Sequence, residues 1–303
     1  MKTVRTVEAL RAELAEPRRR GRSIGLVPTM GAFHDGHLSL MRRAREACDV
    51  VVVSLFVNPA QFNEAGDLEI YPRDEGRDAA LAAAAGVDIL FAPDVNDVYP
   101  DGFGTAVTVR GLTEGLEGAH RGHGHFDGVT TVVAKLLNMV GPDVAYFGQK
   151  DAQQAAVVRR LVRDLNFPVR IEVCPTVRAQ DGVALSSRNV LLSEAERVQA
   201  SALSRSLQAV KAAVAAGERD PEAAVAAGRT ELEAAGLKPD YLAIVSPQTM
   251  EPVTRIEDDD VLAAVAARVG PVRLIDNLPI TISKHRIRDT HNTVATPHGA
   301  STS

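Results

Sequence analysis

Short apolar runs alternate with segments of helical periodicity along the first 175 residues of this chain. The run SIGLVPT at 23–29 predicts a strand, and the segment at 37–48 places apolar side chains at helical spacing. The next run, DVVVVSLFVN at 49–58, predicts a second strand that is apolar on both faces, as a buried parallel sheet requires. These three segments therefore predict a βαβ unit.

The same alternation continues up to residue 175. The expected elements, in chain order, are a helix at 74–85, a strand at 86–93, a helix at 128–140, a strand at 143–148, a helix at 151–164 and a strand at 167–175. Repeated βα units with right-handed crossovers predict an α/β fold, a Rossmann-like doubly wound parallel sheet over residues 1–175. In such a sheet the ligand crevice lies at the carboxyl ends of the strands.

The pattern changes after residue 176. Helices are expected near 194–216 and 220–236, followed by short strands at 240–246, 261–270 and 272–280. This order predicts a smaller α+β C-terminal domain at 176–285. Residues 286–303 have little apolar content, which predicts a disordered tail.

Composition and charge narrow the function classes. The 303 residues are 45% apolar, and 34 Lys plus Arg against 39 Asp plus Glu give a formal net charge of −5. This balance lacks the basic footprint of nucleic-acid binding, so any phosphate must be bound by a local site. Cys48 and Cys174 stand far apart among apolar residues and are expected to be reduced core thiols. Without a signal peptide or a long apolar run, we expect a cytoplasmic protein that does not contact a membrane.

The stretch PTMGAFHDGH at 28–37 directly follows the first strand. Gly31 permits a tight turn, and Gly36 lies where the next helix begins, so a phosphate could approach the backbone N–H groups there. His34 and His37 could then hydrogen-bond phosphate oxygens during phosphoryl or nucleotidyl transfer. The alternatives are two ordinary loop histidines, or a zinc site, for which this loop offers no third ligand.

Two further polar loops follow strands. FVNPAQF at 56–62 supplies the amides of Asn58 and Gln61, suited to the hydroxyls and carboxylate of a small substrate, although an Asn-Pro turn would look the same. YFGQKDAQQ at 146–154 supplies Lys150, Asp151 and Gln154. A lysine at this place can reach α-phosphate oxygens, whereas Asp151 could simply cap the following helix.

LSSRN at 185–189 offers Ser186, Ser187 and Arg188, whose hydroxyls and guanidinium match triphosphate oxygens. A solvent-exposed loop is the plain alternative.

The stretch HRGHGHF at 120–126 carries three histidines, at positions 120, 123 and 125. A zinc site is possible, but the stretch has no acidic or cysteine partner, so we favour a mobile or phosphate-contacting glycine-rich loop. Upstream, Asp74 and Asp78 would share one helix face at i, i+4. We interpret them as an exposed charged face rather than a magnesium site.

Four stretches together carry a resemblance to a known family. PTMGAFHDGHLSL, FVNPAQF, RGHGHFDGVTTVVAKLLNMVGPDVAYFGQKDAQQ and LSSRN stand in the order and at the spacing of pantothenate synthetase, the pantoate–β-alanine ligase. The chain resembles this family over residues 1–285. The resemblance implies a nucleotide-binding domain of the HxGH nucleotidyltransferase superfamily, a C-terminal lid domain and a homodimer.

The resemblance also implies the reaction. ATP and pantoate form pantoyl adenylate and pyrophosphate, and the amine of β-alanine then attacks the acyl adenylate, which releases AMP and pantothenate. Mg²⁺ would accompany ATP, held mainly by the phosphates.

Site residues carry over by position. The implied catalytic residues are His34, His37 and Lys150. The implied ATP-binding residues are Met30, His34, His37, Gly148, Lys150, Asp151, Ser186, Ser187 and Arg188, with Asp151 as a ribose contact. The implied pantoate-binding residues are Met30, Asn58, Gln61 and Gln154. His125 also carries over, and Arg121 is a further candidate.

The chain departs from the family pattern at three places. Phe33 stands where Leu is common and Gln149 where Glu is common, and neither supplies a proposed contact. The usual Arg-Pro-Gly-His-Phe is replaced here, so that Gly122 takes the arginine position and Arg121 precedes it. The competing functions are a different HxGH nucleotidylyltransferase, a nonenzymatic nucleotide-binding regulator and, third, a zinc hydrolase.

Overall fold

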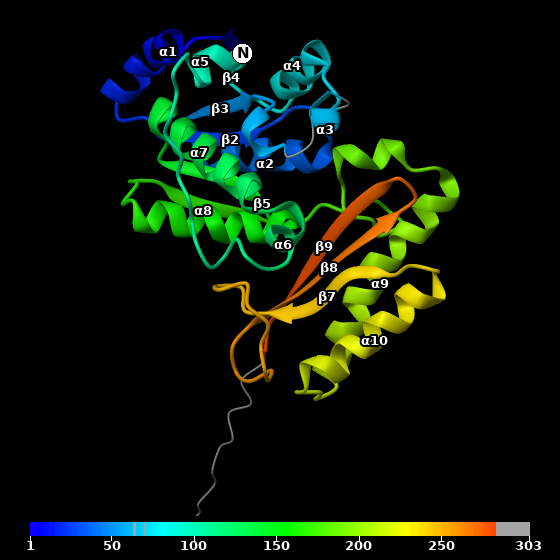
Figure 1. Ribbon diagram of the computed structural model, residues 1–303. Helices are drawn as coiled ribbons and strands as arrows, with labels where there is room; N and C mark the ends of the chain where they lie inside the picture. The colour runs from blue at the N-terminus through cyan, green and yellow to red at the C-terminus, as the bar shows by residue number, and fades with distance from the viewer. Residues whose placement is uncertain (63–64, 70, 283–303) are drawn as a thin grey trace, which may run out of the picture.

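The computed structural model describes residues 1–62, 65–69 and 71–282, and Figure 1 shows two parts, each built on its own sheet. The N-terminal part contains a six-stranded parallel sheet. Its strands are β1 Lys2–Val4, β2 Ile24–Thr29, β3 Val50–Leu55, β4 Ile89–Phe91, β5 Val144–Gly148 and β6 Arg170–Cys174. The long helices are α1 Val7–Arg19, α2 Asp35–Ala47, α4 Glu75–Ala84, α7 His123–Val140 and α8 Ala152–Asp164. Shorter ones are α3 Ala65–Glu69, α5 Val95–Val98, α6 Glu117–Arg121 and the 3₁₀ turns η1 Pro59–Gln61, η2 Gln149–Asp151 and η3 Ser187–Leu191.

Helices cover both faces of this sheet because alternate strand residues point to opposite sides. Ile24 and Leu26 pack into one core with residues of α1, α7 and α8. Val27, on the opposite side of the same strand, packs into a second core with residues of α2 and α4. Cys48 and Cys174 are buried in that second core and are not bonded to each other. The continuous apolar strands thus predicted a sheet that is buried on both faces.

The strand order is β1-β4-β3-β2-β5-β6. From β2 the chain adds β3 and β4 on one side, and it then returns to add β5 and β6 on the other. The topological switch point therefore lies between β2 and β5, where ligands of open α/β sheets bind. The PTMGAFHDGH stretch follows β2 and the YFGQKDAQQ stretch follows β5, so the topology brings both to this point.

Two expectations for the N-terminal part need correction. The short edge strand β1 and the helix α1 were not expected from the sequence pattern. The glycine-rich stretch at 120–126 was expected to be a phosphate-contacting or mobile loop; the loop is wrong, because all of it but Gly122 is helical, and the phosphate contact stays a prediction. Helix α6 ends at Arg121, Gly122 turns the chain at φ 76°, and α7 begins at His123, five residues earlier than expected. Phe126 is 2% exposed and anchors the new helix in the core.

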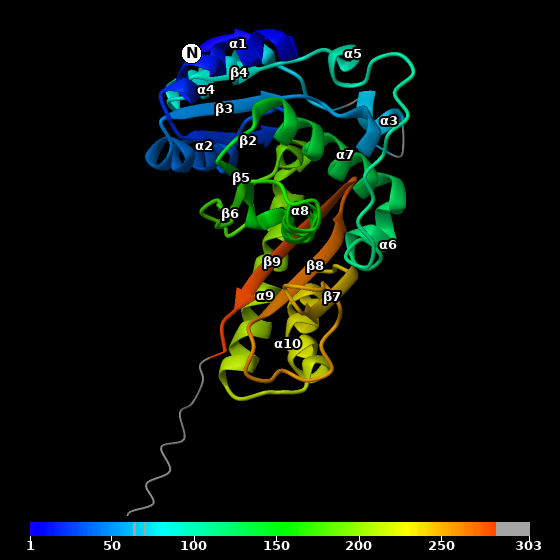
Figure 2. The same cartoon turned by 90° about the vertical axis from the view of Figure 1, so that its left-hand side faces the viewer.

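The C-terminal part contains α9 Glu194–Ala215, α10 Pro221–Ala234 and the antiparallel strands β7 Pro239–Val245, β8 Val261–Val269 and β9 Val272–Ile280. Residues of α9 and α10 form a core with one face of this sheet. On the other face, Val245 and Leu262 join the core of α1, α7 and α8. Figures 1 and 2 both show the three strands between the C-terminal helices and the N-terminal part.

The expected fold class is confirmed: a doubly wound parallel sheet with a smaller α+β unit. The boundary at 175 stays a prediction, as does the one at 285, because residues 283–303, including the expected tail at 286–303, lie outside the described residues. Among the described helices, none combines the length and apolar character needed to cross a membrane.

Candidate active site

A cavity of about 660 Å³ opens at the switch point, within the size range of small-molecule sites. It is lined by residues that follow β2, β3, β5 and β6 and by residues of the C-terminal part. Every site residue expected from the sequence lines it: Met30, His34, His37, Asn58, Gln61, Arg121, His125, Gly148, Lys150, Asp151, Gln154, Ser186, Ser187 and Arg188. The structure thus brings all of them together.

The HxGH turn is built by its own local hydrogen bonds. His34 is the N-cap of α2, and its Nδ1 accepts the Gly36 N–H at 3.1 Å. The His34 N–H points back to Nδ1 of His37 at 3.4 Å, and the two rings lie 4.1 Å apart. A Cβ on Gly36 would come within 2.8 Å of the His34 ring. Glycine between the histidines is therefore a requirement of packing.

Both histidines of this turn are neutral near pH 7. Burial, with a smaller effect from Lys150, lowers the pKa of His34 to about 4. Burial, with a smaller effect from His34, lowers the pKa of His37 to about 3. Because each Nδ1 accepts a hydrogen bond, the ring proton belongs on Nε2. The pair can donate two N–H bonds to an anion without being cations.

Asp78 is buried and holds the backbone of the HxGH turn. The expectation that Asp74 and Asp78 form an exposed charged face is therefore wrong for Asp78. Asp78 is 1% exposed, and its two carboxylate oxygens accept the N–H groups of Ala32 at 2.7 Å and Phe33 at 2.8 Å. Ala32 has φ 53°, a left-handed conformation that is uncommon without glycine. Asp74, by contrast, is the exposed N-cap of α4. The i, i+4 spacing did not reveal that the helix buries one of the two carboxylates.

Two amides lie side by side in the loop after β3. Asn58 is 1% exposed; its Nδ2 donates to Gln61 Oε1 at 3.0 Å and to the Gly128 carbonyl at 3.1 Å. Its Oδ1 accepts from the Tyr99 hydroxyl at 2.8 Å. Gln61 Nε2 in turn donates to Met30 Sδ at 3.1 Å. Asn58 therefore orients Gln61, and its direct contact with pantoate stays a prediction.

His125 lies beside these amides. Its Nδ1 donates to the Gln61 carbonyl at 2.8 Å, which leaves Nε2 as an acceptor. Burial lowers the pKa of His125. The tautomer of His125 is thus the reverse of that of the HxGH pair. His120 also lines the cavity, whereas the side chain of His123 lies outside the described residues. Among the described residues, no group of three or more His, Cys, Asp and Glu side chains could hold a metal ion.

Lys150 stands on the 3₁₀ turn η2, directly between β5 and α8. Its ammonium is 3.4 Å from Asp151 Oδ1. Burial alone would raise the pKa of Asp151, but Lys150 holds it below its usual value. Asp151 occupies the N-cap position of α8, but its side chain makes no capping hydrogen bond to this helix. Gly148 ends β5 just before this turn, and Gln154 lies in the first turn of α8.

The Ser186–Arg188 segment follows a short hairpin after β6. Ser186 accepts the Arg188 N–H at 3.3 Å and so begins η3. All three side chains line the cavity and none is fully exposed, which argues against a plain solvent loop.

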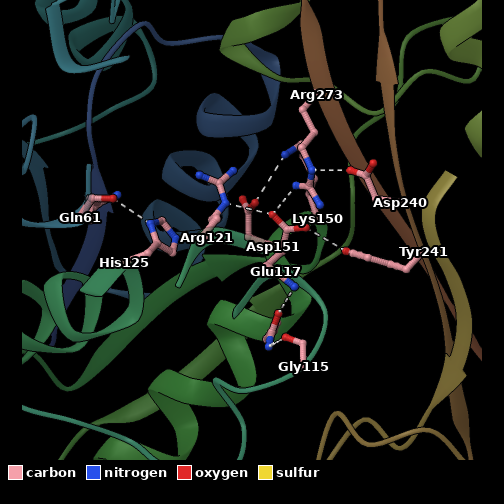
Figure 3. A network of polar contacts seen from close by, with 11 residues as sticks. Gln61, Gly115, Glu117, Arg121, His125, Lys150, Asp151, Asp240, Tyr241 and Arg273 are labelled. Carbon is pink, nitrogen blue, oxygen red and sulfur yellow. Dashed lines mark hydrogen bonds and ion pairs between the residues drawn. The ribbon is translucent and has the colours of Figure 1, made fainter. Parts of the chain in front are cut away.

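Four interacting side chains line another part of the cavity, and of these only Arg121 was a candidate from the sequence. Figure 3 shows Arg121, Tyr241 and Arg273 converging on Glu117 of α6. Glu117 Oε2 lies 3.0 Å from Arg121 Nε and 2.8 Å from an Arg273 nitrogen, and the Tyr241 hydroxyl donates to Oε1 at 3.0 Å. Burial alone would raise the pKa of Glu117, but Arg273 and Arg121 hold it below its usual value. Arg121, which directly precedes the position where the family commonly has its arginine, thus forms an ion pair with Glu117.

A family model described as pantoate-beta-alanine ligase matches residues 2–279 of the chain. The chain belongs to this family. A pantothenate synthetase of Cereibacter sphaeroides is 55% identical over 277 residues, which make up 91% of this chain and 99% of that protein. The crystal structure of a pantothenate synthetase from Thermus thermophilus has a TM-score of 0.87 at 51% identity and covers 92% of this chain and 99% of its own.

A more distant structure adds ligands. The pantoate-beta-alanine ligase of Francisella tularensis, complexed with beta-gamma ATP and beta-alanine, is 33% identical, with a TM-score of 0.76 and coverage of 92% of this chain and 97% of its own. Membership in the pantoate–β-alanine ligase family confirms the resemblance and makes the chain a ligase, which synthesises pantothenate from pantoate and β-alanine. The nonenzymatic regulator and the zinc hydrolase are therefore set aside.

Proposed function

We propose that the chain performs both steps of pantothenate synthesis in this one cavity. The pantoate carboxylate attacks the α-phosphorus of ATP, and pyrophosphate leaves. The β-alanine amine, after losing a proton, attacks the acyl carbon of pantoyl adenylate, and AMP leaves. The observation that carries the proposal is that two neutral imidazoles and an ammonium meet in one cavity, from the two strands that flank the switch point.

ATP would lie along the HxGH turn and the Lys150 turn. The Nε2–H groups of His34 and His37 would donate to phosphate oxygens, and Lys150 would stabilise the charge that develops at the α-phosphate. The hydroxyl and guanidinium groups of the Ser186, Ser187 and Arg188 segment would bind the β- and γ-phosphates. The remaining ATP contacts would be Met30, Gly148 and Asp151, the last at the ribose. The Francisella tularensis relative, with its bound beta-gamma ATP, supports this use of ATP.

Pantoate would lie between the two glutamines. Gln61 and Gln154 come from opposite sides of the switch point, and their amides can bond the hydroxyls and carboxylate of this small acid. Asn58 and Met30 both contact the Gln61 side chain, which supports a role in setting its orientation. His125 holds the same residue by its carbonyl. The carboxylate would thus face the α-phosphate, and alignment would supply much of the rate.

Mg²⁺ would enter with ATP. The described residues form no cage of three metal ligands, and both oxygens of Asp78 already accept backbone bonds, which fits an ion held mainly by phosphates and water. When bound, the ion would neutralise phosphate charge. A homodimer in the cytoplasm and a lid function for the C-terminal part remain part of this proposal on the strength of the family resemblance.

Pyrophosphate release from Mg-ATP tests the proposal, first with pantoate alone and then with β-alanine, while AMP and pantothenate are followed by mass spectrometry. We expect slow or single-turnover release with pantoate and multiple turnovers with pantothenate formation after β-alanine is added. If pantoate elicits no pyrophosphate, the assignment of Gln61 and Gln154 is wrong.

A further inference from the structure

The turn that carries Lys150 is held by the C-terminal part of the chain. Asn277 of β9 is 4% exposed, and its Nδ2 donates to the carbonyls of Gln149 and Lys150, both at 2.9 Å. Its Oδ1 accepts from Gln149 Nε2 at 2.9 Å. Three hydrogen bonds of this one side-chain amide therefore go to two consecutive residues of η2. The contact joins the two sheets at the residue proposed to act on the α-phosphate.

The Lys150 side chain is only loosely fixed by its ion pair. This side chain is 21% exposed, and its ammonium lies a long 3.4 Å from the Asp151 carboxylate. A lysine has a flexible four-carbon stem, so the place that its charge can reach depends on where its backbone is held. The three-residue turn η2 lies directly between β5 and α8, and the Asn277 bonds add a further support to its backbone from the other sheet.

Asp276, the residue before Asn277 in β9, contacts the hairpin that leads into the Ser186–Arg188 segment. Asp276 is 4% exposed and forms a two-point ion pair with Arg178, at 2.6 and 2.9 Å. Arg178 bridges to Ala184 in the hairpin that leads into Ser186. Two neighbouring residues of one strand thus contact the Lys150 turn and the hairpin that leads into the Ser186–Arg188 segment.

We propose that Asn277 is a positioning residue for Lys150 and acts on the adenylation step through the backbone of η2. The inference rests on the proposed function, because it assigns Asn277 to the Lys150 step. Without the Asn277 amide, the lysine charge would be displaced from the α-phosphate. A displacement of about 1 Å can slow a reaction by about 10²-fold.

The test measures the rate of pyrophosphate release in the first turnover, with saturating Mg-ATP and a range of pantoate concentrations, for Asn277→Ala, Lys150→Ala and the double variant. We expect Asn277→Ala to lower the maximal rate of adenylation by about 10- to 100-fold, with the half-saturating pantoate concentration within about twofold of the wild type. In the Lys150→Ala background, the same change should have almost no further effect, because its target is gone. Gln149→Ala removes only the bond to Asn277 Oδ1 and should slow adenylation by less.

Asp260→Ala is the matched control. Asp260 accepts the Ile282 N–H at 3.1 Å, so this change also removes a bond from a side chain to the backbone of the C-terminal part, but away from η2. Adenylation by this variant should stay near the wild-type rate.

Three outcomes would overturn the positioning role. The first is a wild-type rate of adenylation in Asn277→Ala. The second is a double variant whose rate falls by the product of the two single effects, and the third is an Asp260→Ala variant that is slowed as much as Asn277→Ala. If Asn277→Ala does not fold, Gln149→Ala takes its place in the test. A wild-type rate of adenylation in Gln149→Ala would then overturn the positioning role of Asn277. Failure of the proposed function is distinct, since the wild-type chain would then release no pyrophosphate with pantoate.

Discussion

The two sides of the cavity are supported in different ways. The HxGH turn after β2 is held within the N-terminal part, by capping bonds between its own residues and by Asp78, which lies 45 and 46 positions from the two residues it contacts. The Lys150 turn after β5 is held by Asn277, which lies 127 and 128 positions away on the other sheet. The hydrogen bonds described for the first side therefore come from the N-terminal part alone, whereas the second side also receives bonds from the C-terminal part.

This difference changes how a lid can work. A C-terminal part that swung away freely would break the Asn277 bonds to η2 and the buried Glu117–Arg273 pair, which all join the two parts. Motion that excludes water from the acyl adenylate would have to carry the Lys150 turn along or be confined to other segments. If the C-terminal part acts as the proposed lid, its closure and the placement of Lys150 are linked.

The largest expected effect tests whether both sides act on the same step. Lys150→Ala and His37→Ala should each lower the rate of adenylation by about 10²- to 10³-fold, because each removes a group that stabilises charge in the transition state. Pyrophosphate release with pantoate measures the rate. Lys211→Ala, which removes an exposed lysine of α9, is the control and should adenylate normally. Near-normal turnover of either test variant would refute its assignment.

The second prediction concerns the join between the two parts. Glu117→Ala should lower the free energy of unfolding by about 3 kcal/mol, since it leaves Arg273, which is 10% exposed, with only its ion pair to Asp240 among the described residues. Denaturant unfolding measures the loss. Glu222→Ala is the control, because it removes an exposed ion pair with Arg229 at 3.7 Å. Its loss of unfolding free energy should be below about 0.5 kcal/mol. Equal losses would show that the Glu117 group does not hold the parts together.

The long elements could be predicted because their signals are local. The strand β8 is apolar at every position but Arg268, and β9 is apolar at most of its positions. The structure places both within one residue of the expected bounds. The edge strand β1 has only one buried residue among three, so it gives almost no apolar signal. The glycines at 122 and 124 resembled a loop, but the first ends one helix and the second lies inside the next.

The candidate site was predictable where its residues stand in short motifs beside strands. All 14 expected residues line one cavity. Asn277, Glu117 and Arg273 were missed because nothing near them in sequence indicates a partner; Asn277 finds its own partner 128 positions away. Asp78 was misinterpreted since spacing alone does not show which face of a helix is buried.

The third prediction concerns the support that Asp78 gives to the HxGH turn. Asp78→Asn should lower the adenylation rate by about tenfold, because an amide can accept only one of the two N–H bonds and turns a donor toward the other. Ala32 would then relax from its left-handed conformation and shift His34. Asp74→Asn is the control, as asparagine caps a helix about as well as aspartate. If both variants adenylate equally well, the turn holds its shape without Asp78.

The smallest expected effect is the pH dependence that His37 of the HxGH turn contributes to stability. The folded chain holds the pKa of His37 at about 3, whereas a histidine in the unfolded chain takes up its proton near pH 6.5. Protons therefore bind the unfolded state first, so this contribution to stability is complete above pH 6.5 and is lost as the pH falls. Between pH 6.5 and 5.5 the loss from one such histidine is about 1 kcal/mol.

Urea unfolding at the two pH values measures this loss, and His37→Ala should reduce it by about that 1 kcal/mol relative to the wild type. Lys211→Ala is the control and should leave the loss unchanged, because lysine side chains ordinarily titrate far above this range. An identical loss in His37→Ala and the wild type would mean that the pKa of His37 is the same in the folded and the unfolded chain. The groups that form the Asn277 contact are amides and backbone carbonyls, which do not titrate between pH 6.5 and 5.5. Asn277→Ala should therefore show the wild-type pH dependence of stability. This measurement distinguishes the two sides of the cavity without using catalysis.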